Sequence, residues 1–172
     1  MGSSVAEEGP SQRRPPGLGG WVGALVLIGG LVGALILLVA EFTTLFAVQT
    51  PSGTIHSEGT GSHHAFAMAL IAIVAGWLAV GAWRAGSRPA LLALGALGVL
   101  ALLISLLGDL PDAQAHGLVR AGAHLELASA KPSAGLYMDT LGGALLLISS
   151  VSAFILIGPP PPARERPAAR DE

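Results

Sequence analysis

Cysteine is absent from the 172 residues of this chain, and charged residues make up only 12% of it. Without a thiol, the chain cannot carry out disulfide exchange or thiolate catalysis, and it cannot hold a cysteine-ligated cluster or a covalently attached haem. Soluble domains contain about 25% charged residues, whereas this chain is 52% hydrophobic. It has too few polar side chains to cover a soluble surface, which indicates a membrane protein.

Ionisable residues are also missing from the middle of every long apolar stretch. A charge at the centre of a membrane span costs about 2.5–3.5 kcal/mol, and proteins that move ions or protons keep such residues for function. A proton-coupled carrier, an ion pore and a voltage sensor are therefore disfavoured. The stretches offer no facing histidines for haem, and the chain has neither a Gly-x-Ser-x-Gly motif nor a phosphate-binding glycine loop. We expect no enzymatic activity, no catalytic residue and no bound cofactor.

What the chain does contain is four apolar stretches of about 20 residues each. At about 1.5 Å per residue, each can cross a hydrocarbon core of about 30 Å. We therefore expect an all-α fold, a membrane-spanning four-helix bundle, within residues 18–158. The expected spans are about 20–40, 63–83, 89–108 and 137–157, and residues 1–17 and 159–172 are expected to be disordered tails.

Arginines mark one side of the expected membrane. Arg84 and Arg88 lie in the short turn between the second and third stretches. The two tails carry the other arginines of this side: Arg13, Arg14, Arg164, Arg166 and Arg170. Short loops that carry arginine stay in the cytoplasm. We expect this turn and both termini to be cytoplasmic, with two longer loops on the outer side.

Small residues recur within the spans at spacings that place them on one helix face. Residues four apart share a face, and a glycine there lets a neighbouring backbone approach closely. The alternative is that glycine is simply common in membrane spans. The candidate packing positions are Gly19, Gly23, Gly29, Gly33, Gly76, Gly95 and Gly98.

All five histidines fall on the expected outer side. The first outer loop, residues 49–62, is expected to be rich in turns, with Ser62 as the N-cap of the second span. If this loop folds back, a zinc or copper ion could be held by His56, Glu58, His63 and His64. Their spacing matches no established ligand pattern. Two alternatives remain open: the imidazoles sense pH, or they are solvated loop residues.

The second outer loop, from Asp109 to Gly135, is longer than a minimal connection. Its polar residues recur every four positions, opposite apolar ones, which predicts an amphipathic interfacial helix on the outer membrane surface. Gly117 and Gly122 oppose that helix, each by up to about 1 kcal/mol. The expected outer polar stripe consists of Asp112, His116, Arg120 and His124.

Several features are shared with one group of proteins: the four-span layout, the Ala-, Leu-, Gly- and Val-rich spans, the arginine excess over a single lysine, and the Gly-Leu-Tyr and Leu-Gly-Gly patterns within residues 135–143. In these the chain resembles the small four-span inner-membrane proteins of bacteria with GC-rich genomes. The resemblance covers residues 18–158 and implies a multi-pass protein of the cytoplasmic membrane.

We expect a non-catalytic accessory, scaffold or assembly subunit. Within the lipid bilayer it would bind another membrane protein, or a copy of itself as a homo-oligomer, through the small-residue helix faces. Nucleic acid is not expected as a partner. The alternative is a small transport-related or sensing protein that uses the outer histidines and acids for metal or pH.

Overall fold

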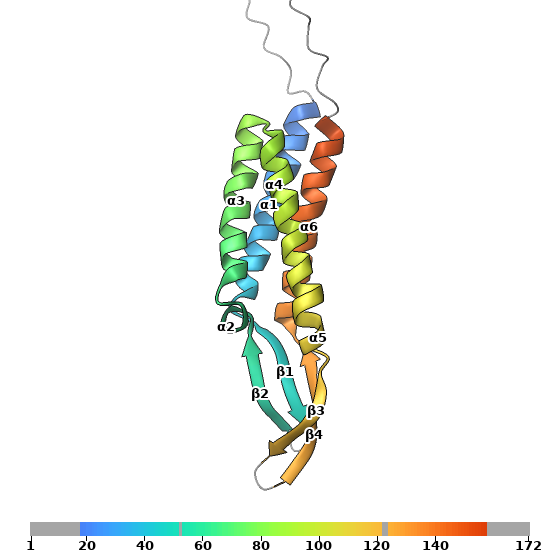
Figure 1. Cartoon of the computed structure of the whole chain (residues 1–172). Coiled ribbons are helices and arrows are strands. Elements are labelled where there is room, and N and C mark those ends of the chain that lie inside the picture. Colours follow the sequence, from blue (N-terminus) through green and yellow to red (C-terminus); the bar gives the residue numbers. More distant parts are fainter. Residues whose placement is uncertain (1–17, 52, 122–123, 158–172) are drawn as a thin grey trace, which may run out of the picture.

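The structure, a computed structural model, describes residues 18–51, 53–121 and 124–157. A bundle of long helices occupies one end of the molecule and a β-sheet projects from the other end along the bundle axis (Figure 1). The long helices are α1 (Leu18–Ala40), α3 (Ala67–Ala85), α4 (Arg88–Leu103) and α6 (Ala134–Ile157). The expected tails, residues 1–17 and 159–172, lie outside the described residues.

Among the described residues, four helices are long and apolar enough to cross a membrane, as expected from the sequence. The third of them continues beyond α4 through a π-helix, η1 (Ile104–Asp109), and a short helix, α5 (Leu110–Asp112). In the bundle, α1 and α4 each contact both α3 and α6. The α3–α4 turn lies at the end of the bundle away from the sheet, as do the first residue of α1 and the last of α6 (Figure 1).

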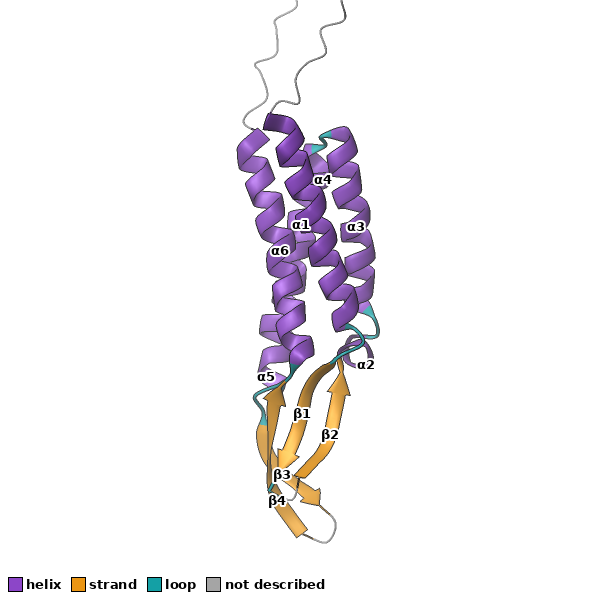
Figure 2. Cartoon of the chain, turned by 180° about the vertical axis from the view of Figure 1, so that it is seen from behind, coloured by secondary structure: helices purple, strands orange, loops and turns teal. Residues whose placement is uncertain are grey.

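The sheet corrects the expected all-α fold. Its strands are β1 (Thr44–Thr50), β2 (Gly53–Gly59), β3 (His116–Ala121) and β4 (His124–Pro132). They pair antiparallel in the order β2-β1-β4-β3, so that β1 and β4, far apart in the chain, meet at the centre. Figure 2 shows the strands gathered at one end of the helices. The expected first loop is therefore largely a β-hairpin.

The prediction of an amphipathic helix in the second outer loop is also wrong, because most of this segment forms β3 and β4. Asp112 lies in α5, His116 and Arg120 lie in β3, and His124 begins β4. Residues four apart share a face in a strand as well as in a helix, so the polar spacing could not distinguish the two. The glycines at 117 and 122 oppose the helix, and pairing with β4 satisfies the backbone of β3.

Glycines let the four helices approach one another inside the bundle. A Cβ at Gly33 would lie 3.0 Å from the Gly142 carbonyl oxygen, and one at Gly30 would lie 2.6 Å from the Ala79 Cβ. Of the expected packing positions, Gly23 meets Trp83, Gly29 meets Ser149, Gly95 meets Ser150, Gly98 meets Gly143 and Gly76 faces Leu31 at 4.0 Å. The surroundings of Gly19 lie outside the described side chains.

One buried hydrogen bond joins α4 and α6 in the apolar part of the bundle. The Ser150 hydroxyl donates to the Leu91 carbonyl oxygen at 2.6 Å. Ser87 caps α4, and Pro89 lies in its first turn, where a missing N–H costs nothing. Because the bond satisfies a hydroxyl that water cannot reach, it fixes the register of the two helices.

Candidate functional site

Polar side chains are buried where the helix bundle meets the sheet. Glu41, Thr60, Ser105, Asp109 and Asp139, the buried polar layer below, are each no more than 4% exposed. Glu41 and Thr60 flank the first hairpin, Ser105 and Asp109 lie in η1, and Asp139 lies in the second turn of α6. The sequence places these acids at span ends, where water is expected. The structure buries them instead, so this layer is a site that sequence reasoning missed.

Glu41 caps the start of α3 from a distance in the chain. Its Oε1 accepts a hydrogen bond of 2.6 Å from the Ala69 backbone N–H, while the N-cap residue Phe66 makes no side-chain cap bond. A carboxylate at a helix N-terminus satisfies an N–H and opposes the positive end of the helix dipole. The other oxygen, Oε2, finds no hydrogen-bond partner among the described residues.

The chain turns sharply before α3. A short helix, α2 (Thr60–His64), is followed by Ala65 and Phe66, both with positive φ, of 49° and 63°. Non-glycine residues adopt this conformation only where surrounding contacts impose it. The second span therefore begins at Ala67 rather than near 63. Ser62, expected as its N-cap, lies inside α2.

Glycine contacts hold α2 against the ends of α1 and α6. A Cβ at Gly61 would lie 2.9 Å from the Glu41 carbonyl oxygen, and one at Gly135 would lie 2.5 Å from the Thr60 hydroxyl. The Gly61 N–H donates to that same Glu41 carbonyl at 3.1 Å. The Thr60 hydroxyl, fully buried, has no hydrogen-bond partner among the described residues. Thr60 thus lies in the contact between α2 and α6.

The π-helix brings Ser105 and Asp109 to this junction. Its wider turn is closed by the Leu110 N–H bonding the Ser105 carbonyl oxygen. Such single π-turns occur often at functional sites. Both side chains are fully buried, and the Ser105 hydroxyl has no hydrogen-bond partner in the described part of the chain. No pattern in the sequence signals a π-helix here.

His63 lies between the buried polar layer and the exposed Asp112. Its Nε2 lies 3.7 Å from Asp109 Oδ1 and 3.8 Å from Asp112 Oδ2. The Asp109 side chain is buried whereas that of Asp112 is exposed, and the imidazole between them is 27% exposed. A protonated imidazole would pair with both carboxylates. The His63 ring also packs edge-on against Phe46 of β1, at 5.8 Å between ring centroids.

His56 and Glu58 form a separate pair on β2. The His56 Nε2 lies 2.9 Å from Glu58 Oε2, and the Ser62 hydroxyl donates to Glu58 Oε1 at 3.0 Å. The hydrogen bond with His56, and to a smaller extent the one from Ser62, holds the pKa of Glu58 below its usual value. The pair is exposed, so water screens it.

The expected metal site does not form in the part of the chain that is described. No group of three or more His, Asp or Glu side chains there is arranged to hold a metal ion. His56 and Glu58 meet each other, whereas His63 lies against Asp109 and Asp112. The side chain of His64 lies outside the described ones. Zinc or copper at these four residues remains a prediction without a supporting arrangement.

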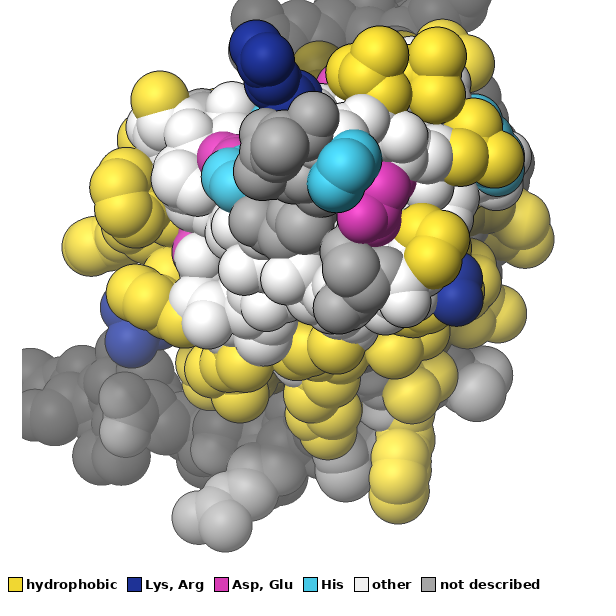
Figure 3. All heavy atoms as spheres, turned by 90° about the horizontal axis from the view of Figure 1, so that it is seen from below, with side chains coloured by type: hydrophobic (Ala, Val, Ile, Leu, Met, Phe, Trp, Pro, Cys, Tyr) yellow, Lys and Arg dark blue, Asp and Glu magenta, His cyan; other side chains and the backbone are white. Residues whose placement is uncertain are grey.

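The sheet carries a row of exposed leucines on one face. Leu118 and Leu125 are each 70% exposed and Leu127 is 65% exposed. Leu118 of β3 pairs with Leu127 of β4. Leu125 precedes Leu127 by two residues in β4, so both lie on the same face of the sheet. We call these three residues the leucine patch. Seen from this end, hydrophobic side chains lie beside histidine, acidic and basic ones (Figure 3).

A hollow of about 360 Å³ adjoins the same sheet. Its apolar lining includes Phe46 and Val48 of β1, Val119 of β3, and Ala128 and Ala130 of β4. The sheet also has two open edges among the described strands, β2 and β3. Apolar surface and unpaired strand edges together are the features by which sheets bind other proteins.

Comparisons with protein-family models, with curated proteins and with solved structures find no match for this chain.

Proposed function

We propose that this protein is a non-catalytic accessory or scaffold subunit of a membrane complex, and that the sheet is the surface to which its partner protein binds. The four helices serve as the membrane anchor. The exposed leucine patch carries the proposal, because a contiguous apolar surface on a water-facing element marks a protein interaction site. A partner with an apolar face of matching size fits it.

The helix faces are less suitable for a partner than the sequence suggests. The glycine positions expected to bind another membrane protein meet the chain's own helices, as in the contacts of Gly33 with Gly142 and of Gly98 with Gly143. Small-residue faces bind by close backbone approach. Except at Gly76, which meets only Leu31 at 4.0 Å, these faces are already occupied within the bundle, which favours the sheet as the partner surface.

The membrane itself is an unsuitable binder of the leucine patch. The sheet projects from the bundle along its long axis (Figures 1 and 2), so β3 and β4 lead away from the apolar belt of the helices. Leu118, Leu125 and Leu127 are therefore placed in water when the four helices cross a bilayer. Exposed leucine in water favours burial at about 25 cal/mol per Å² of apolar surface.

The arginines support one orientation of this assembly. Arg84 and Arg88 lie at the bundle end opposite the sheet, and short arginine-bearing turns stay in the cytoplasm. We propose a multi-pass protein of a bacterial cytoplasmic membrane, with both termini inside and the sheet outside. The partner is then met on the outer surface.

Replacing the leucine patch by alanine (L118A/L125A/L127A) is expected to release the partner. Each truncation removes apolar side-chain surface that the contact would bury, at a cost of about 1 kcal/mol, so binding should weaken on the order of 100-fold. The measurement is native gel electrophoresis of the mildly solubilised protein from the cells that make it. The wild type should migrate as a complex larger than the monomer and the variant as the monomer.

A matched control replaces three exposed leucines on the helices, Leu70, Leu106 and Leu107, by alanine. This variant should keep the complex. A monodisperse wild-type monomer would refute the proposal. So would a complex that survives in the sheet variant and is lost in the helix variant, since the partner would then bind the membrane-facing helices.

A further inference from the structure

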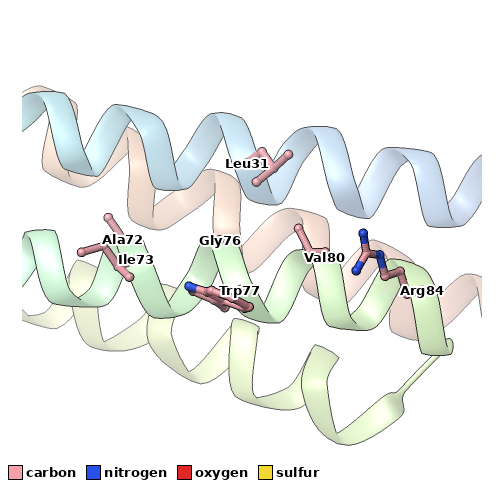
Figure 4. Close-up of a pocket in the computed structure, with 7 residues that line it drawn as sticks. All are labelled: Leu31, Ala72, Ile73, Gly76, Trp77, Val80 and Arg84. Carbon is pink, nitrogen blue, oxygen red and sulfur yellow. The ribbon is translucent and has the colours of Figure 1, made fainter.

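A groove runs along the membrane-facing surface between α1 and α3. It encloses about 510 Å³ and is lined by Leu31 on α1 and by residues one helical turn apart on α3, Ala72, Gly76 and Val80, with Trp77 at the side and Arg84 at the end. Figure 4 shows Arg84 at one end of this row, beyond Val80. Gly76 forms its floor, because no side chain there fills the space.

The length of the groove matches one leaflet of a bilayer. From Ala72 to Arg84 the helical rise is about 18 Å, against about 15 Å for half of a hydrocarbon core. Arg84 lies in the last turn of α3, next to the turn that leads to α4, and so at the level of the lipid headgroups. The apolar lining then faces the acyl chains of that leaflet.

Arg84 gives the groove a charged end. The side chain is exposed, and none of the ion pairs found within the described residues includes it. A guanidinium binds a phosphate through two parallel N–H···O bonds, and arginine near a membrane surface is attracted to anionic lipid. The groove therefore combines an apolar slot with a phosphate-binding group at the matching depth.

We propose that this groove binds an anionic phospholipid, with an acyl chain lying over Gly76 beside Trp77 and the phosphate held by Arg84. The charge of Arg84 selects an anionic headgroup over a zwitterionic one, and the apolar lining of the groove takes the acyl chain. The site needs only that the four helices cross a membrane. It is independent of the sheet and of any partner there.

Trp77, which is 78% exposed, is a built-in probe of what lies in the groove. The variant W21F/W83F leaves Trp77 as the only tryptophan. It is reconstituted in phosphatidylcholine vesicles that contain a minor fraction of phosphatidylglycerol, with bromine on the acyl chains of one lipid or of the other. Bromine quenches indole fluorescence on contact, so the two mixtures report which lipid lies against Trp77.

We expect brominated phosphatidylglycerol to quench Trp77 about fivefold more than random mixing of the two lipids would give. This ratio corresponds to the attraction of about 1 kcal/mol between one arginine and an anionic lipid. R84Q should remove that preference and R84K should keep part of it. The control R120Q removes an arginine of β3, in the sheet at the bundle end opposite Arg84, and should leave the preference unchanged. Native mass spectrometry of the same proteins should show a retained anionic lipid that R84Q loses.

Three results would overturn the proposal. Equal quenching by the two lipids would show no selection of charge. A preference that persists in R84Q, with the variant folded by circular dichroism, would place the anionic site elsewhere. Absence of quenching by either lipid would mean that a helix, from a partner or a second copy, covers the groove and the adjoining hollow lined by Leu35 and Leu38.

Discussion

Replacing Gly98 by alanine should destabilise the bundle by about 1–3 kcal/mol, the usual cost of overpacking. An added Cβ there would lie 2.7 Å from the Leu147 backbone nitrogen and 2.9 Å from the Gly143 carbonyl oxygen. Both atoms belong to the backbone of α6, so no side chain can rotate away. The two helices must separate, which weakens the packing along their whole contact.

The measurement is unfolding of the purified protein by denaturing detergent, followed by circular dichroism. Gly81 provides the control, because a Cβ at that position meets nothing within 4 Å. G81A should unfold no more easily than the wild type, since alanine favours helix over glycine by up to about 1 kcal/mol. If G98A and G81A behaved alike, the close α4–α6 approach would be wrong.

Replacing Glu41 by alanine should cost about 1–3 kcal/mol of stability. The change removes the acceptor of the 2.6 Å bond from the partly buried Ala69 N–H, and a donor that loses its partner away from water carries a penalty of this order. It also removes a negative group from the N-terminal end of α3. We expect faster hydrogen exchange at the amide of Ala69, measured by NMR in detergent micelles.

E41Q separates the capping role from a general effect of substitution. Glutamine keeps a side-chain carbonyl oxygen able to accept from the Ala69 N–H, so it should lose less stability than alanine and keep the amide protected. Equal losses in E41A and E41Q would mean that the cap bond contributes little and that the charge of Glu41 dominates.

The helices could be predicted from the sequence because each is specified locally. An uninterrupted apolar run of membrane length, with Pro89 in a first turn or Gly86 after a last one, carries its own signal. The second span shows the limit. Its start at Ala67, after the left-handed Ala65 and Phe66, depends on contacts with α1 that no local pattern reveals.

The sheet could not be predicted because its pairing is long-range. β1 lies between β2, which follows it in the chain, and β4, and its Phe46 pairs with Pro132 of β4, far along the chain. The polar spacing of His116 and Arg120 fits a helix face and a strand face equally. Weak local preference then decides nothing, and tertiary pairing determines the structure.

The buried polar layer was missed for the same reason. Asp109 and Asp139 stand at the ends of apolar stretches, which is where interfacial acids normally face water. In the structure β1 packs against α6 and His63 of α2 lies against Asp109, while the π-helix carries Ser105 and Asp109 into the junction. A residue's burial depends on what packs over it, so an error about the two outer segments becomes an error about the acids.

Cysteine accessibility tests the central claim, that the sheet and the arginine-bearing turn lie on opposite sides of a membrane, with the sheet outside. The chain has no cysteine of its own, so single substitutions at the exposed residues Ser57 of β2 and Ala85 at the end of α3 report unambiguously. A membrane-impermeant maleimide should label S57C in intact cells, and A85C only after permeabilisation. Labelling of A85C from outside, or of both residues from the same side, would contradict the account.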